Sequence, residues 1–267
     1  MWQIFKQLNQ KNLSMEVHHK HHIPKNWKEY FTEFIMLFAA VTLGFFAENI
    51  REHYIESHRA TVFLEQIKND LKKDIANMNA NIRVRQSKAI YIDSLLSLPP
   101  DLKDKKDENA FGYCTRIISL RGMFSRSETG FEQLKNAGGL RLIKNPTLVQ
   151  KLQEYEHLFD RLLNLQDLEE VELQDYRVRI TEIVDYRVYR DIKRKNENAA
   201  TGDNVVIEYD MAPEYRPLLT KEFKKINSVL GMVVFVKNMN NSAIKQQMNY
   251  IKAAEELIEL IDTENNH

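Results

Sequence analysis

The chain has 267 residues, of which 43% are hydrophobic and 28% are charged, so its composition excludes an intrinsically disordered protein. Lysine and arginine together number 38, as do aspartate and glutamate, and this balance excludes the basic excess typical of nucleic-acid binding. Eight glycines and six prolines are few, which predicts long helices with few turns.

The first 26 residues are a basic, histidine-rich tail that ends shortly after Pro24, an expected break before a helix. Within it, His18, His19, His21 and His22 could bind Zn²⁺ or Ni²⁺, because imidazole is a ligand of both metals. A flexible cluster lacks the fixed geometry of a metal site, however. We therefore favour a partly protonated tail beside anionic lipid headgroups, and we expect no cofactor.

An uncharged apolar run, FIMLFAAVTLGFFA, extends from Phe34 to Ala47. Its 14 residues would span about 21 Å as a helix, which is short for a hydrocarbon core of about 30 Å. Counted from 31 to 50, the segment has the roughly 20 residues that a membrane span needs. Trp27 and Tyr30 precede the run and Tyr54 follows it, as in the aromatic belt of a membrane protein.

Two other interpretations of this run fit less well. A cleaved signal peptide would begin closer to the N-terminus and be followed by a cleavage site between small residues, which GFFAENIRE does not offer. A buried helix of a soluble protein would need equally apolar partners, and no other segment supplies them. The sequence thus predicts a transmembrane anchor at 27–50, with the basic tail at 1–26 in the cytoplasm and 51–267 outside it.

Two acidic residues, Glu33 and Glu48, lie near the ends of this anchor. They could form an ion path in an oligomer, because acids inside a membrane are often functional. About 22 Å of helix separates them, so they cannot share a proton within one subunit. We favour positions at the membrane interface, with Arg51 pairing with Glu48 one helical turn away.

The rest of the chain reads as helices joined by a few loops. The first helix should continue to about Leu96, near 105 Å of helix from Trp27, with a bend in the polar patch ANMNANIRVRQ at 76–86. A loop is expected near 97–109, a short helix at 110–120, a long helix from Pro146 to about Lys195, a loop near 193–214 and a last helix at 215–262. VVIEYD at 205–210 is expected to be extended coil. We predict an all-α fold, in which the anchor continues into an elongated antiparallel helical bundle or coiled-coil-like stalk.

One local pattern predicts a tight helical corner. Thr129 and Glu132 have the spacing of a capping box, Gly138 or Gly139 suits the left-handed residue that ends a helix, and Asn145 with Pro146 can start the next one. A DNA-reading helix-turn-helix is the alternative, which the lack of basic surplus disfavours.

A family resemblance appears on these residues. TEFIMLFAAVTLGFFAENIRE followed by FEQLKNAGGLRLIKNPTLVQKLQEY resembles an uncharacterised family of bacterial single-span inner-membrane proteins, over roughly residues 28–160. The resemblance implies an α-helical domain outside the inner membrane, in the periplasm. It implies no activity and no catalytic residue.

The sequence contains no motif for a nucleophile, a phosphate loop or a catalytic metal. The acidic pairs Glu169–Glu170 and Glu255–Glu256 are expected to face solvent, and Cys114 to be a small buried side chain. We therefore predict a non-enzymatic structural or scaffolding protein of the bacterial envelope. Its expected partners are the lipid bilayer and either further copies of itself or another envelope membrane protein, without nucleic acid. The alternative is a ligand-sensing or accessory subunit that passes a signal through the continuous anchor helix.

Overall fold

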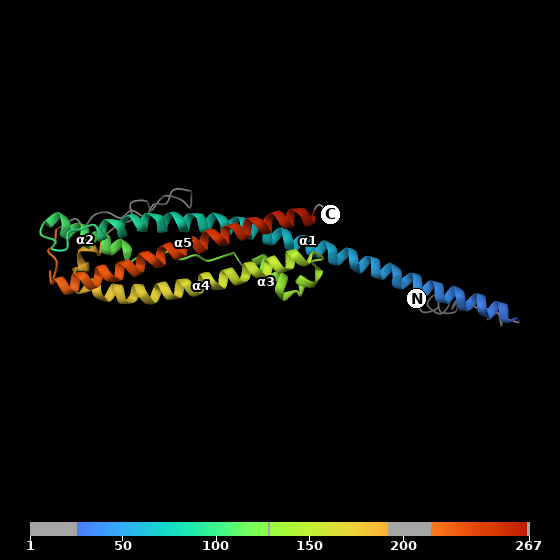
Figure 1. Cartoon of the computed structure of the whole chain (residues 1–267). Coiled ribbons are helices and arrows are strands. Elements are labelled where there is room, and N and C mark those ends of the chain that lie inside the picture. Colours follow the sequence, from blue (N-terminus) through green and yellow to red (C-terminus); the bar gives the residue numbers. More distant parts are fainter. Residues whose placement is uncertain (1–25, 128, 192–214, 266–267) are drawn as a thin grey trace, which may run out of the picture. The chain divides into compact units, whose positions relative to one another are not determined.

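A computed structural model describes residues 26–127, 129–191 and 215–265 (Figure 1). Over these residues the chain is helical and has no strand, which confirms the predicted all-α class. The described residues form five α-helices and two short 3₁₀ helices: α1 (Trp27–Leu96), α2 (Lys105–Ile118), α3 (Thr129–Asn136), η1 (Gly139–Leu142), α4 (Pro146–Thr181), η2 (Tyr186–Tyr189) and α5 (Phe223–Asn265).

The chain divides into two compact units, residues 1–55 and 56–267, so the boundary falls within α1 and five residues beyond the predicted edge of the anchor. The first unit contains the apolar part of α1. The second contains the rest of α1 and all later elements, and the two units are described separately.

The second unit has a core with the spacing of a coiled coil. Buried positions along α1, α4 and α5 alternate in steps of three and four, the 3.5-residue period by which long helices keep one seam facing their partners. These buried positions are Ala60, Leu64, Ile67, Leu71, Asp74, Met78, Asn81, Arg85, Lys88, Ile92 and Leu95 in α1; Leu148, Leu152, Tyr155, Phe159, Leu162, Gln166, Glu169, Leu173, Tyr176 and Ile180 in α4; and Ile226, Val229, Val233, Val236, Asn240, Ala243, Gln247, Tyr250, Ala254, Leu257 and Ile261 in α5.

Helix α5 runs antiparallel to α1 in the second unit. Lys68 near the start of this part of α1 pairs with Asp262 near the end of α5, whereas Asp93 near the end of α1 accepts from Lys237 at 2.8 Å. Helix α5 also packs along α4, and Figure 1 shows the three helices side by side.

Helices α1 and α4 run in the same direction. Asp74 of α1 meets the Tyr155 hydroxyl of α4 at 3.1 Å, and Arg85, eleven residues further along α1, meets Glu169, fourteen residues further along α4. The sequence predicts an up-and-down arrangement, in which successive long helices run in opposite directions. The connection from α1 to α4 differs, because the chain returns to the other end of the bundle without a long helix, so that α4 runs parallel to α1.

The return is made by α2 and by an extended stretch, residues 120–127, which we call the return segment. Its backbone is held by polar side chains of α1 and α4. Lys88, Arg85 and Asn81 donate to the carbonyls of Leu120, Gly122 and Met123 at 3.0, 2.8 and 3.0 Å, Asp74 accepts from the Ser127 amide at 2.7 Å, and Gln166 accepts from the Phe124 amide at 2.7 Å. These bonds satisfy backbone groups that no helix or sheet ladder satisfies.

Three expected boundaries are corrected. Helix α2 begins at Lys105, inside the predicted loop at 97–109, because Asp107 and Glu108 favour a helix N-terminus and Glu108 is buried there, accepting from the Leu218 amide at 3.0 Å. Helix α4 ends at Thr181 rather than near Lys195. Directly after this end, Ile183 and Val184 are buried in the hydrophobic core. The last helix, expected at 215–262, begins only at Phe223, where α5 starts. The predicted loop at 193–214, with its VVIEYD segment, lies outside the described residues.

The polar patch at 76–86 is predicted to be a place where the first helix bends, and the bend stays a prediction. Helix α1 continues through it, and Asn81 and Arg85 of the patch are buried. The patch is polar because it faces polar side chains of the other helices, as shown below.

The helical corner lies between α3 and α4. Gly138 has φ 63° and ψ 24°, the left-handed conformation that glycine adopts without steric cost, and Gly139 next to it is buried. Asn145 is the N-cap of α4, where its side chain accepts from the Thr147 amide at 3.0 Å, and Pro146 is the first helical residue. The capping box stays a prediction, because α3 begins at Thr129 and that side chain lies outside the description.

Candidate functional site

The apolar run of α1 is the first candidate site. An 18-residue window here has a mean hydropathy of 1.7, so the helix is long and apolar enough to cross a membrane. None of this window is buried. The large side chains from Phe34 to Phe46 are exposed on every face of the helix. A buried core helix would be covered by its own protein, so the described residues offer no support for that interpretation. The run is a candidate membrane span.

The residues expected at the membrane interface all lie on α1 and are exposed. Trp27 and Tyr54 are among the most exposed large hydrophobic side chains, and Tyr30 and Glu33 are exposed as well. Arg51 pairs with Glu48 within the helix, with 2.9 Å between Nε and Oε2. The structure thus brings Glu48 and Arg51 together.

A second candidate site is a layer of buried polar side chains in the second unit. It separates two hydrophobic clusters, one that contains Leu64 and Ile261 and one that contains Leu95 and Ile226. We call it the central polar layer, and its members occupy core positions of all three long helices: Asn81, Arg85, Lys88, Gln166, Glu169, Asn240 and Gln247. Polar groups at core positions cost stability but fix the register of packed helices.

The central polar layer is organised around Arg85 and Glu169. Two parallel hydrogen bonds join them, Nη1 to Oε1 at 2.9 Å and Nη2 to Oε2 at 2.7 Å. The guanidinium also donates to Asn81 at 3.1 Å, to the Gly122 carbonyl at 2.8 Å and to Asn240 at 3.5 Å, so all five of its N–H donors are used. Burial acts to raise the pKa of Glu169, but the hydrogen bonds and charge of Arg85 hold it below its ordinary value.

Lys88 is the second buried cation of this layer. Its ammonium donates to the Leu120 carbonyl at 3.0 Å and lies 3.8 Å from Glu169, whose two oxygens already accept from Arg85. Burial lowers the pKa of Lys88 to about 8; Glu169 opposes this shift, and Arg85 and Arg177 add to it. Its charge is thus balanced less completely than that of Arg85.

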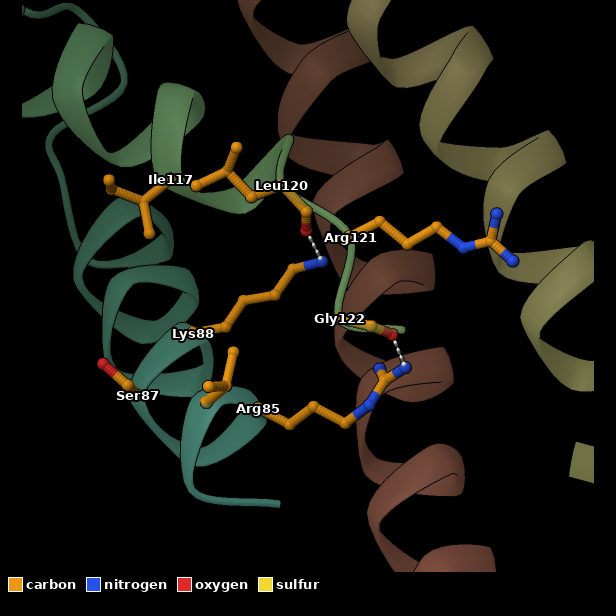
Figure 2. Close-up of a pocket in the computed structure, with 8 residues that line it drawn as sticks. Arg85, Ser87, Lys88, Ile117, Leu120, Arg121 and Gly122 are labelled. Atoms are coloured by element: carbon orange, nitrogen blue, oxygen red, sulfur yellow. Dashed lines mark hydrogen bonds between the residues drawn. The ribbon is translucent and has the colours of Figure 1, made fainter. Parts of the chain in front are cut away.

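A small cavity of about 20 Å³ lies beside these two cations. Its lining comes from α1, α2 and the return segment: Val84, Arg85, Ser87, Lys88, Ile117, Leu120, Arg121 and Gly122. Figure 2 shows Arg85 and Lys88 extending from α1 toward the return segment, with Arg121 pointing away toward α4. A volume of this size holds one water molecule or one small ion and no organic ligand.

A larger groove of about 370 Å³ lies between α1 and α5, lined by Asn79, Ile82, Arg83, Gln86, Met248, Ile251, Lys252 and Glu255. Its size is that of a small-molecule site. Its walls mix polar, charged and apolar side chains, and the described residues place no group of metal-binding side chains there.

Other candidate chemistry finds little support in the described residues. They contain no group of three or more histidine, cysteine, aspartate or glutamate side chains that could hold a metal ion. His18, His19, His21 and His22 lie outside them. Cys114 is buried as predicted, and burial raises its thiol pKa to about 11, so the thiol stays protonated and unreactive near neutral pH.

Sequence reasoning missed the central polar layer. Glu169 was expected to face solvent together with Glu170, but it is buried, because the three-four spacing that begins at Leu148 places 166 and 169 in the core. The same spacing places Arg85 and Lys88 in the core of α1. Extending each apolar stripe through its polar interruption would have found the layer.

Comparisons of the chain with protein-family models, with curated proteins and with solved structures found no match. The resemblance to an uncharacterised envelope family therefore stays a prediction, and a function has to rest on the residues themselves.

Proposed function

We propose that the chain is a single-pass, membrane-anchored structural or scaffolding protein of the bacterial inner membrane. The observation that carries this proposal is the candidate span in α1, whose apolar side chains are exposed on every face. Such a surface is stable only when lipid or another protein covers it, and its length suits lipid. The basic tail at 1–26 favours a cytoplasmic N-terminus, and residues 51–267 then form a periplasmic helical bundle.

A scaffolding role is supported by the character of the second unit. Its three long helices share a core with coiled-coil spacing, and its polar interior is used to hold the chain in one arrangement. Proteins of this construction provide long surfaces on which other proteins assemble. The partners proposed are further copies of the chain or another envelope membrane protein.

Membrane fractionation with an alkaline carbonate wash, combined with reporters fused at His267, tests the anchor and its orientation. We expect the full chain to stay in the membrane pellet, with activity from a periplasm-dependent reporter and none from a cytoplasm-dependent one. Release by carbonate would overturn the membrane proposal, and the opposite reporter pattern would overturn its orientation. Native mass spectrometry from mild detergent tests assembly, and a strict monomer without partners would count against scaffolding.

A sensing or accessory subunit is the second candidate, favoured by the groove of about 370 Å³ between α1 and α5. Because α1 is one continuous helix from Trp27 to Leu96, a ligand in this groove would contact the same helix that contains the candidate span. A thermal-shift screen of the full chain in detergent tests this function. A stabilising metabolite whose effect is lost in Met248→Asp would support sensing over scaffolding.

A further inference from the structure

The small cavity beside Lys88 has a lining of one charge sign. Three of its lining residues, Arg85, Lys88 and Arg121, have basic side chains, and no residue of the lining is acidic. A cavity with this lining attracts negative charge, and desolvation makes the attraction stronger than it would be at a surface.

The charges around the cavity do not balance. Arg85 uses both oxygens of Glu169, the one carboxylate in the central polar layer. Arg121 extends toward α4, where Glu170 lies 3.6 Å from it, so its charge is met there. Lys88 is left with a share of Glu169 at 3.8 Å and with a neutral carbonyl, that of Leu120.

A buried cation without a full counter-charge is costly, and a protein can remove the cost by losing the proton or by binding an anion. Burial is the main cause of the lowered pKa of Lys88; the charges of Arg85 and Arg177 lower it further, and Glu169 only partly opposes the shift. Near neutral pH, below that pKa of about 8, Lys88 remains mostly charged, so a bound anion would relieve the imbalance.

We propose that the cavity lined by Arg85, Lys88 and Gly122 binds a small monovalent inorganic anion of the chloride type, with Lys88 as its counter-charge. The size fits, because a cavity of about 20 Å³ admits a particle near the size of a water molecule. Val84, Ile117 and Leu120 form an apolar part of the lining, which suits a weakly hydrated halide better than a strongly hydrated ion.

Anion-dependent unfolding of the full chain in neutral detergent tests this site. The midpoint of thermal unfolding would be followed at pH 7 as sodium gluconate is replaced by sodium chloride or bromide at constant ionic strength. We expect a saturable rise of about 2 to 4 °C with chloride or bromide. The rise should shrink at pH 9.5, where Lys88 is neutral. An unfolding midpoint that does not respond to the replacement would overturn the proposal.

A matched pair of lysine variants locates the effect. Lys88→Met should abolish the chloride response, whereas Lys245→Met, on the exposed face of α5, should retain it. An undiminished response in Lys88→Met would place any halide binding elsewhere and overturn the site. If Lys88→Met does not fold, crystals of the unaltered chain soaked in bromide decide the question. An anomalous peak in the cavity supports the proposal, and density without anomalous signal would show a water molecule there and overturn it.

Discussion

Arg85 of α1 and Glu169 of α4 form a bidentate ion pair in the core of the second unit, with 1% and 3% of their side chains exposed. The pair replaces apolar contacts at core positions of two parallel helices, and the guanidinium also holds the return segment through the Gly122 carbonyl. It therefore links three parts of the fold through one side chain.

The first prediction concerns the loss of one partner. Glu169→Gln leaves Arg85 buried without its counter-charge, and we expect the free energy of unfolding to fall by about 3 to 5 kcal/mol. Chemical denaturation in detergent, followed by circular dichroism, would measure it. Asp175→Asn removes an exposed pair with Arg179 and serves as the control, with an expected loss under about 1 kcal/mol. Equal losses in the two variants would show that burial of the pair contributes little.

The double variant Arg85→Met with Glu169→Leu, measured by the same denaturation, tests whether the unpaired charge of Arg85 causes the loss of stability. Because apolar residues can replace a buried ion pair with little loss, we expect it to be more stable than Glu169→Gln. A double variant as unstable as the single one would mean that the cost comes from the lost hydrogen bonds to the return segment or from Lys88, which also loses Glu169, rather than from the unpaired charge of Arg85.

The second prediction concerns the helical corner. Gly138→Ala places a side chain at φ 63°, which should destabilise the second unit by about 1 to 2 kcal/mol. Gly231→Ala is the matched control, because Gly231 lies within α5 with nothing within 4 Å of an added Cβ, and alanine there should stabilise by about 0.5 to 1 kcal/mol. Thermal unfolding of both variants would test the opposite signs, and a stabilising Gly138→Ala would contradict the left-handed assignment.

The sequence predicted the features that rest on local rules. Gly138, Asn145 and Pro146 have the positions expected of them, because a left-handed glycine and an N-cap are set by a few neighbouring residues. The candidate span was equally visible, since length and apolarity can be counted along the chain.

The core of the second unit could not be predicted in the same way. Glu169 is buried against Arg85 and Lys88, which lie 84 and 81 positions before it along the chain. A prediction from its polarity alone put Glu169 on the surface. The return segment has no helical period, and side chains of distant helices hold its backbone. Such elements are specified by tertiary contacts, which a single sequence does not list.

The third prediction is a pH dependence of stability. Lys88 has a folded-state pKa of about 8, below the ordinary value of 10.5, so between these values the unfolded chain binds a proton that the folded chain does not. Stability from this group should therefore rise with pH, on the order of 1 to 2 kcal/mol between about pH 8 and 9.5.

This pH dependence is measured as a difference, because burial also raises the pKa of Cys114 and of Tyr186, and those groups act in the opposite direction at high pH. The unaltered chain and Lys88→Met would be compared by denaturation in chloride-free buffer. We expect the rise in the unaltered chain alone. Parallel pH profiles would show that Lys88 titrates normally.

The last prediction concerns the candidate span. Leu43 is exposed near the middle of the apolar run, and Leu43→Arg should raise the apparent free energy of membrane insertion by about 3 kcal/mol. Ile90→Arg, on the same helix and similarly exposed but outside the run, is the control. Carbonate-resistant membrane association should fall for Leu43→Arg and stay unchanged for Ile90→Arg. If both variants remain in the membrane pellet to the same extent, the run does not act as the anchor, and its exposed apolar surface must be covered by protein.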